Sequence, residues 1–193
     1  MSNSDKLTQK FNTILDKIND YQPDFSNEKI TNAFHLARDG HKGQSRYSGD
    51  PFLMHPLSVA EMLADMKLDV DTIIAAILHD VAEDTDYTLE DIEENFGSEI
   101  KKMVDGVTKL GKVKHDGVER YVGSLKKTFL AMAEDARVIL IRLADRAHNL
   151  LTVEVHSDKK SKRRAKESLE IYAEVAGNLE MNHLRRKIEN RAV

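Results

Sequence analysis

The chain of 193 residues contains no cysteine and no tryptophan, and it has only 3 prolines and 9 glycines. Without cysteine, disulfide bonds, thiolate zinc sites and a thiol nucleophile are excluded, so any metal ligand must be His, Asp or Glu. No apolar run approaches the roughly 20 residues that span a bilayer. The first eleven residues lack the basic start and the apolar stretch of a secretory signal. We therefore expect a cytoplasmic protein with no membrane partner.

A strong excess of charge is also missing. The 29 Lys and Arg residues nearly balance 33 Asp and Glu residues, which gives a net charge of −4. Such a balance offers no general reason to expect nucleic-acid binding. Two basic clusters, residues 159–164 and 183–187, lie beside acidic residues and are explained by solvated helix faces. The composition leaves the oligomeric state open.

The scarcity of proline and glycine leaves long stretches in which helical spacing dominates. Apolar residues from Leu7 to Ile18 form one stripe, and Ser26 or Asn27 is suited to cap a second helix. Residues 138–143 have a β-like composition, but their neighbours favour helix. Further helices are predicted over about 56–66, 71–84, 88–96, 98–107, 119–134 and 136–155, and in the final segment. The sequence therefore predicts one all-α domain, 1–193, with about eight to ten helices.

Two local signals set boundaries within this pattern. Residues 40–52 concentrate Gly, Ser, Asp and Pro and therefore predict a loop. Thr88 and Asp91 have the spacing of a capping box, which predicts a helix start, and Gly97 is placed to end that helix.

The segment LHDVAEDT places four ionisable side chains at the end of a very apolar run. On one continuous helix, with about 100° per residue, they share a face about 140° wide: His79, Asp80, Glu83 and Asp84. Three carboxylates this close raise one another's pKa unless a cation compensates. Adjacent His79 and Asp80 can hold a divalent metal, and the other two can orient or deprotonate a water. A solvated helix end is the alternative, and these residues alone leave the two interpretations about equal.

A second apolar run, later in the chain, ends in the same way. Asp145 and Asn149 are neighbours at i and i+4, so an amide can support an Asp ligand. In isolation, a surface ion pair of Asp145 with Arg142 or Arg146 is the better explanation. His148 lies off that face, and we expect a structural role for it.

His55 ends an apolar stretch directly before a predicted helix start, with Pro56 at the first helical position. A lone His in this place is more often packed than a ligand. Taken with the two clusters, however, it completes an H…HD…D set of two nitrogen and two oxygen ligands: His55, His79, Asp80 and Asp145.

This set resembles the signature of the HD superfamily of metal-dependent phosphohydrolases, which is helical. Four successive motifs are more narrowly similar to those of the Rel/Spo-type alarmone hydrolases: RYSGDPFLMHP (46–56), ILHDVAEDT (77–85), FGSEIKKMVDGVTKLGK (96–112) and LADRAHNLLTV (143–153). The resemblance extends over about residues 28–180. It implies a hydrolase that removes the 3′-pyrophosphate of guanosine tetra- or pentaphosphate (ppGpp or pppGpp), giving GDP or GTP and pyrophosphate.

The resemblance also implies roles for individual residues. It implies one Mn²⁺, although Zn²⁺, Fe²⁺ or Co²⁺ binds such a ligand set at least as tightly. The metal ligands are then His55, His79, Asp80 and Asp145. The residues that activate the attacking water are Glu83 and Asp84. The loop expected to contact the guanine base contains Arg46, Tyr47 and Ser48, where Tyr47 replaces a basic residue common in the family. The residues expected to contact the ribose and phosphates are Thr108, Lys109 and Asn149.

Three alternatives remain at this point. The chain can be an HD-domain nucleotidohydrolase for another nucleotide, such as a dNTP, a mononucleotide or NADPH. It can be a catalytically silent module that binds the alarmone, or a helical scaffold without a metal. Its length leaves no room for a synthetase domain, so we expect degradation alone, unless the chain is a fragment of a longer bifunctional protein.

Overall fold

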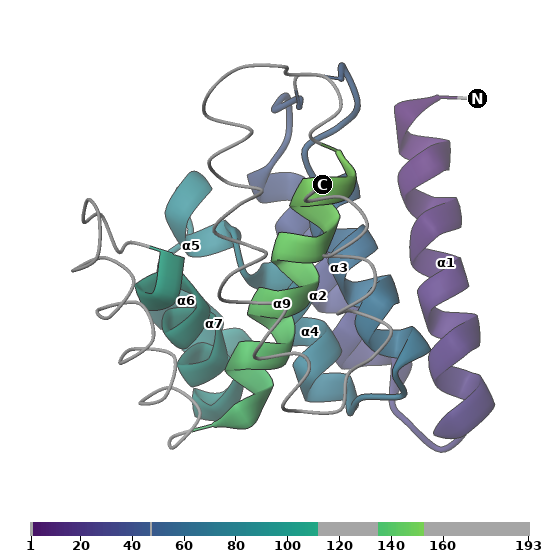
Figure 1. Ribbon diagram of the computed structural model, residues 1–193, viewed down its shortest axis with the longest axis vertical. Helices are drawn as coiled ribbons and strands as arrows, with labels where there is room; N and C mark the ends of the chain where they lie inside the picture. The colour runs from purple at the N-terminus through teal and green to yellow at the C-terminus, as the bar shows by residue number, and fades with distance from the viewer. Residues whose placement is uncertain (1, 47, 112–134, 153–193) are drawn as a thin grey trace.

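The computed structural model describes residues 2–46, 48–111 and 135–152 (Figure 1). Within these ranges the chain is helical, and its β-type pairing is limited to an isolated bridge between Ser45 and Pro51. The predicted all-α class is therefore confirmed. Tyr47, the helix predicted over 119–134, the final segment and both basic clusters lie outside the described residues.

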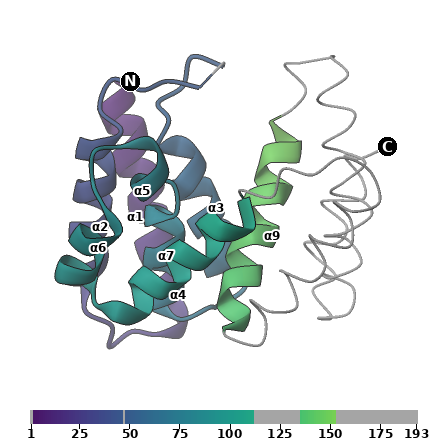
Figure 2. The same ribbon diagram turned by 90° about the vertical axis from the view of Figure 1, so that its left-hand side faces the viewer.

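The helices are arranged around two central ones, α3 and α4. The bounds are α1 Asn3–Tyr21, α2 Asn27–Gly40, α3 Met54–Asp65, α4 Val70–Leu78, α5 Val81–Asp84, α6 Leu89–Phe96, α7 Ser98–Gly111 and α9 Ala136–Leu151. Helix α3 packs against α1, α4 and α9, and α4 also contacts α2 and α7. Figure 1 shows α1 along one side of the molecule and the pair α6 and α7 along the other, and Figure 2 shows this arrangement from the side.

The predicted stripe of α1 faces the core, since Leu7, Phe11, Ile14 and Ile18 are buried. Phe11 stacks on Phe34 of α2 at a centroid distance of 4.3 Å. The first two helices therefore cover one side of α3 and α4.

The predicted local signals are confirmed. Thr88 caps α6, and its side chain and that of Asp91 form both hydrogen bonds of a capping box. Gly97 ends this helix with φ at 93°, a conformation that favours glycine. Ser26 stands at the N-cap of α2, although its side chain makes no capping hydrogen bond. A loop links α2 to α3, as residues 40–52 predict.

One prediction about an element was wrong: residues 71–84 do not form a single helix. Helix α4 ends at Leu78, and α5 begins at Val81. Between them, Asp80 adopts φ −96° and ψ −8°, at the edge of the helical region. The ring of His79 donates from Nδ1 to the carbonyl of Ala76 at 2.7 Å. This side chain thus supplies a partner for one of the carbonyls that a helix end leaves without one.

Helix α4 is the most buried element near this break. All residues from Thr72 to Leu78 are buried, which agrees with the apolar run in the sequence. Among the helices in the described ranges, none combines the length and the apolar character needed to cross a bilayer.

Candidate metal centre

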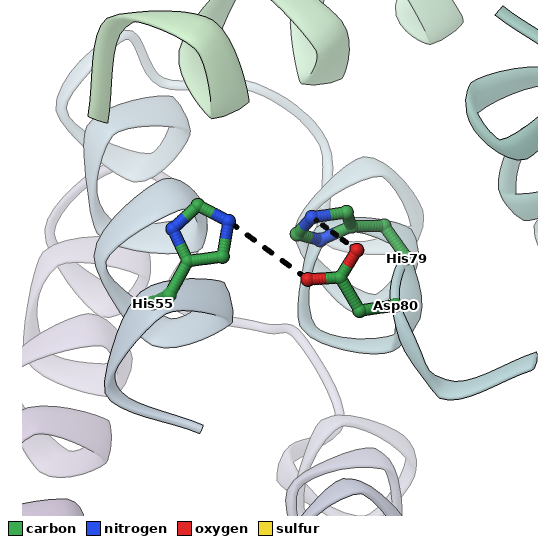
Figure 3. Close-up of side chains that lie close together, drawn as sticks. All are labelled: His55, His79 and Asp80. Atoms are coloured by element: carbon green, nitrogen blue, oxygen red, sulfur yellow. Dashed lines mark ion pairs between the residues drawn. The ribbon is translucent and has the colours of Figure 1, made fainter. Parts of the chain in front are cut away.

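Two neighbouring helices bring His55, His79 and Asp80 together (Figure 3). Their candidate ligand atoms all lie within 4.8 Å of one another. His55 is in the first turn of α3, which begins at Met54 and not at Pro56 as predicted. His79 and Asp80 follow the end of α4. Because both rings are buried and α4 is closely packed, the cluster is held in place by the core.

The carboxylate of Asp80 lies between the two rings. Its Oδ1 is 3.1 Å from Nε2 of His79, and its Oδ2 is 3.8 Å from Nε2 of His55. In Figure 3 the dashed lines mark these two pairs. Two imidazole nitrogens therefore face one carboxylate within a small volume.

The tautomer of His79 follows from its hydrogen bond. A carbonyl can only accept, so the bond from the ring to Ala76 places a proton on Nδ1, and in the neutral ring the lone pair is then on Nε2. This Nε2 is buried and has no hydrogen-bond partner. A buried lone pair without a donor is costly, and a metal ion satisfies it. Imidazole nitrogens and carboxylate oxygens suit a divalent transition metal, so these residues fit such an ion.

Asp145 on α9 joins the cluster through His55. Its Oδ1 is 3.3 Å from Nε2 of His55 and accepts from Nδ2 of Asn149 at 2.5 Å. Its Oδ2 accepts from Nη1 of Arg142 at 2.6 Å. The ion pair considered from the sequence is thus present, but it is buried and not on the surface. Burial favours a higher pKa for Asp145, yet Arg142 and the His rings outweigh it and lower the pKa, so the carboxylate is ionised.

His148, for which the sequence analysis expected a structural role, adjoins the candidate ligands. Its Nδ1 lies 2.7 Å from Nδ1 of His55, and the two ring centroids are 4.8 Å apart. Burial, together with the nearby His55 and Arg46, lowers the pKa of His148 to about 3, so the ring is neutral. The i, i+3 spacing from Asp145, which places two side chains on neighbouring parts of a helix surface, was the signal that could have identified it.

The two candidate water-activating residues lie on α5, one turn beyond Asp80. The side chain of Asp84 is exposed. Even so, partial burial and the negative charges of Asp80 and Glu83 raise its pKa, against the opposing effect of His41. Gln44, in the loop between α2 and α3, donates to the main-chain carbonyl of Asp84 at 2.6 Å and thereby links that loop to α5. A carboxylate with a raised pKa is better suited to accept a proton from water.

His41 is a further residue that the sequence reasoning missed. Its ring is buried, its Nδ1 pairs with Oε1 of Gln44 at 2.9 Å, and it stacks on Phe52. Because the amide nitrogen of Gln44 donates to Asp84, His41 connects the packed loop to α5.

Of the predicted substrate residues, Arg46 and Asn149 adjoin the cluster. Nη2 of Arg46 donates to Oδ1 of Asn149 at 3.1 Å. Burial lowers the pKa of Arg46, although Asp80 and Asp145 oppose this effect. Its Nη1 is also buried and makes no hydrogen bond within the described part of the chain. A desolvated guanidinium thus lies beside the candidate ligands, where it can attract an anion.

The other predicted substrate residues belong to the loop between α2 and α3 and to α7. Ser48 is exposed in the loop and donates to Asp50 at 3.0 Å. Lys109 is exposed on α7 and pairs with Asp105 at 2.6 Å. Thr108 is buried on the same helix, and its hydroxyl has no hydrogen-bond partner among the described residues. Tyr47 is not among the described residues.

The chain is similar to a described family and to several named proteins. The family model described as HD domain matches residues 33–182. The bifunctional (p)ppGpp synthase/hydrolase SpoT of Escherichia coli strain K12 is 43% identical over 180 residues, which cover 93% of this chain and 26% of that protein. The guanosine-3′,5′-bis(diphosphate) 3′-pyrophosphohydrolase of Aquifex aeolicus strain VF5 is 43% identical over 178 residues, or 91% of this chain and 25% of that protein.

A third relative carries a different name. The GTP pyrophosphokinase of Streptomyces coelicolor is 44% identical over 164 residues, which cover 85% of this chain and 19% of that protein. The chain thus spans about a quarter or less of the length of these relatives. A solved structure of a metazoan ortholog of SpoT, described as hydrolysing ppGpp, aligns with a TM-score of 0.64 at 24% identity over 86% of this chain and 94% of that chain. This likeness shows a shared fold.

Proposed function

The chain belongs to the HD domain family, and from this membership we propose that it hydrolyses the 3′-pyrophosphate of guanosine tetra- or pentaphosphate. The products are GDP or GTP and pyrophosphate. The observation that carries the proposal is the group of buried His55 and His79 with half-buried Asp80, in which Nε2 of His79 makes no hydrogen bond. We place this reaction in the cytoplasm, as expected from the sequence.

The choice of substrate is supported by the relatives. Proteins that share 43% identity over 91–93% of this chain are named for the hydrolysis of this bis(diphosphate). One relative is named for both synthesis and hydrolysis of (p)ppGpp and another is named a GTP pyrophosphokinase, and all are far longer than this chain. The aligned part contains the H…HD…D residues, which are suited to hydrolysis.

We propose that one Mn²⁺ is held by His55, His79, Asp80 and Asp145. When bound, such an ion supplies Lewis acidity, which lowers the pKa of water and offsets the negative charge of phosphate oxygens. Asp145 is oriented for this role from both sides, because Arg142 and Asn149 hold its two oxygens.

In this proposal the carboxylates of α5 accept the proton of the attacking water. A water attacks the phosphorus bonded to the ribose 3′ oxygen, and Glu83 and Asp84 position that water and accept its proton. A new P–O bond forms as the bond to the 3′ oxygen breaks. The 3′ oxygen takes up a proton and leaves as the hydroxyl of GDP or GTP, while pyrophosphate is released.

The remaining predicted residues bind the substrate in this proposal. Arg46 supplies positive charge beside the cluster. Its guanidinium is partly desolvated, and its Nη1 makes no hydrogen bond within the described residues, so it is available to a phosphate oxygen. We assign contact with the guanine base to the loop that contains Arg46, Tyr47 and Ser48. The ribose and phosphates are assigned to Thr108, Lys109 and Asn149.

A substrate panel tests this function. The chain, supplied with Mn²⁺, is offered guanosine tetraphosphate, a dNTP, a mononucleotide and NADPH, and each product is separated chromatographically. We expect pyrophosphate and GDP from the tetraphosphate and little turnover of the others. Preferential hydrolysis of any other member assigns the chain to a different nucleotidohydrolase activity.

A double variant, Glu83→Gln with Asp84→Asn, provides the matched control. It keeps the size and polarity of both side chains and removes their capacity to accept a proton. We expect it to bind the nucleotide and to lose turnover. Wild-type turnover no greater than that of this variant supports the silent binding module instead.

A further inference from the structure

His148 lies against a candidate ligand without facing the metal itself. It belongs to the last part of α9, and its Nδ1 is 2.7 Å from Nδ1 of His55 on α3. The rings are tilted by 46° and are not stacked face to face. This distance between two nitrogens is that of a hydrogen bond, so one ring must donate and the other must accept.

The direction of this hydrogen bond decides which nitrogen of His55 carries a lone pair. Nε2 of His55 faces Oδ1 of Asp145 at 3.3 Å and Oδ2 of Asp80 at 3.8 Å. A metal shared with these oxygens needs the lone pair on Nε2, and the proton of His55 is then on Nδ1. His148 must therefore accept through its own Nδ1 and keep its proton on Nε2. With the opposite direction, the proton on Nε2 of His55 occupies the place of the ion.

His79, the other candidate His ligand, also donates from Nδ1, but to a main-chain carbonyl and not to a side chain. The main-chain carbonyl of Ala76 accepts from Nδ1 of His79 at 2.7 Å. A carbonyl can only accept, so the tautomer of His79 is fixed. His55 has a side-chain partner in this place, and its tautomer depends on that of His148.

We propose that His148 is a positioning residue that accepts the Nδ1–H of His55 and thereby directs the lone pair of His55 Nε2 toward the metal. The inference rests on the metal site of the proposed function. It concerns metal affinity in the absence of substrate, so it can fail while the proposed activity stands.

Two variants separate this role from simple packing. His148→Asn places an amide oxygen near the position of Nδ1 and keeps the acceptor. His148→Leu has a similar bulk and no acceptor. Binding of Mn²⁺ to the full chain is measured by calorimetry after chelator treatment, and the unfolding midpoint of each metal-free variant is measured in parallel.

We expect His148→Leu to weaken Mn²⁺ binding about 10- to 100-fold, the range typical for the loss of a partner of a metal-bound His. His148→Asn is expected to stay within a few-fold of the wild type, with similar unfolding midpoints for both metal-free variants. Unchanged affinity in His148→Leu overturns the proposal. Equal losses in both variants, with lowered midpoints, assign His148 to packing.

A spectroscopic measurement on the wild type does not depend on how the variants fold. With ¹⁵N-labelled histidine and diamagnetic Zn²⁺, we expect the nitrogen shifts of His55 to show a protonated Nδ1 and a metal-bound Nε2. A metal-bound Nδ1 contradicts the proposal. If the wild type binds no metal at all, the metal site of the proposed function fails as well, whereas hydrolysis and metal binding that persist in His148→Leu refute this inference alone.

Discussion

At the scale of single residues, Asp145 shows how the site is built. One of its oxygens is held by the guanidinium of Arg142, and the other faces the ring of His55 and the amide of Asn149. A buried carboxylate is costly unless it is paired and hydrogen-bonded. The partners that reduce this cost also fix the orientation of the carboxylate, so one set of contacts serves both stability and ligand geometry.

Asp84 yields a prediction about pH at this scale. Its pKa is raised by partial burial and by the charges of Asp80 and Glu83. As a base it acts only when ionised, so we expect kcat/KM to decline as the pH falls through this raised pKa. The acid limb then lies above the usual range of an Asp. Asp84→Asn is expected to lower kcat by about 10²- to 10⁴-fold and to remove that limb.

The measurement is the pH profile of kcat/KM for the wild type, for Asp84→Asn and for a control variant. The control is Asp86→Asn, the same change at an exposed position two residues further along, which should leave the profile unchanged. A wild-type rate and profile in Asp84→Asn would show that Asp84 is not the base.

At the scale of elements, the interruption between α4 and α5 limits what a sequence pattern can predict. The spacing of the apolar residues favoured a single helix over 71–84, on which the four ionisable residues would share one face. The structure ends α4 at Leu78, where the ring of His79 bonds the carbonyl of Ala76. Such a bond between a side chain and the backbone has no signature in hydrophobic spacing. The capping box at Thr88, in contrast, was predictable because all its contacts are local.

The contact between α7 and α9 gives a prediction about stability. A Cβ added at Gly106 meets both methyl groups of Val138 at 3.0 Å. We therefore expect Gly106→Ala to push α9, which carries Asp145, away from α7. The expected loss is about 1–3 kcal/mol of unfolding free energy, measured by chemical denaturation.

A compensating substitution tests the cause of that loss. Val138→Ala removes the two methyl groups that a side chain at position 106 meets. The double variant is expected to lose less stability than the sum of the two single variants. Strict additivity would mean that the clash with Val138 is not the origin of the effect.

The end of α3 offers a stabilising change. The main-chain N–H of Lys67 donates to Ala64 and that of Leu68 to Leu63, which is the Schellman pattern. Lys67 has φ at 58°, in the left-handed region that favours glycine. This backbone conformation costs a non-glycine residue about 1–2 kcal/mol. A glycine at this position would avoid that cost, but part of the gain is lost because glycine makes the unfolded chain more flexible.

We therefore expect Lys67→Gly to raise the unfolding free energy by about 0.5–1 kcal/mol, as measured by urea denaturation. Lys67→Ala removes the same charge and keeps the strain, so it should leave stability nearly unchanged. An equal gain in both variants would assign the effect to the lysine side chain and not to the backbone.

At the scale of the whole molecule, the site depends on contacts between distant parts of the chain. Arg46 bonds Asn149 across 103 positions, and His55 bonds His148 across 93. The ligand types and their order were predictable from the motifs, and the helices from periodicity. Neither contact was predictable, because they arise from the placement of α9 against α3 and against the loop that precedes α3, and no local pattern encodes that placement.

The same packing explains why the candidate site is rigid. The packed helix α3 carries His55, His79 directly follows the end of α4, and α9 packs over both helices (Figure 1). The cluster therefore forms as a consequence of the fold, before any substrate is bound. We therefore expect that a divalent ion at this cluster is required for hydrolysis.

The most direct test is pyrophosphate release from guanosine tetraphosphate by the chain after treatment with EDTA, measured while Mn²⁺ is added back. We expect no release after chelation and recovery that saturates at one ion per chain, with no recovery in His79→Ala at the same Mn²⁺ concentrations. Release that survives complete removal of metal, or full recovery in His79→Ala, would contradict this expectation.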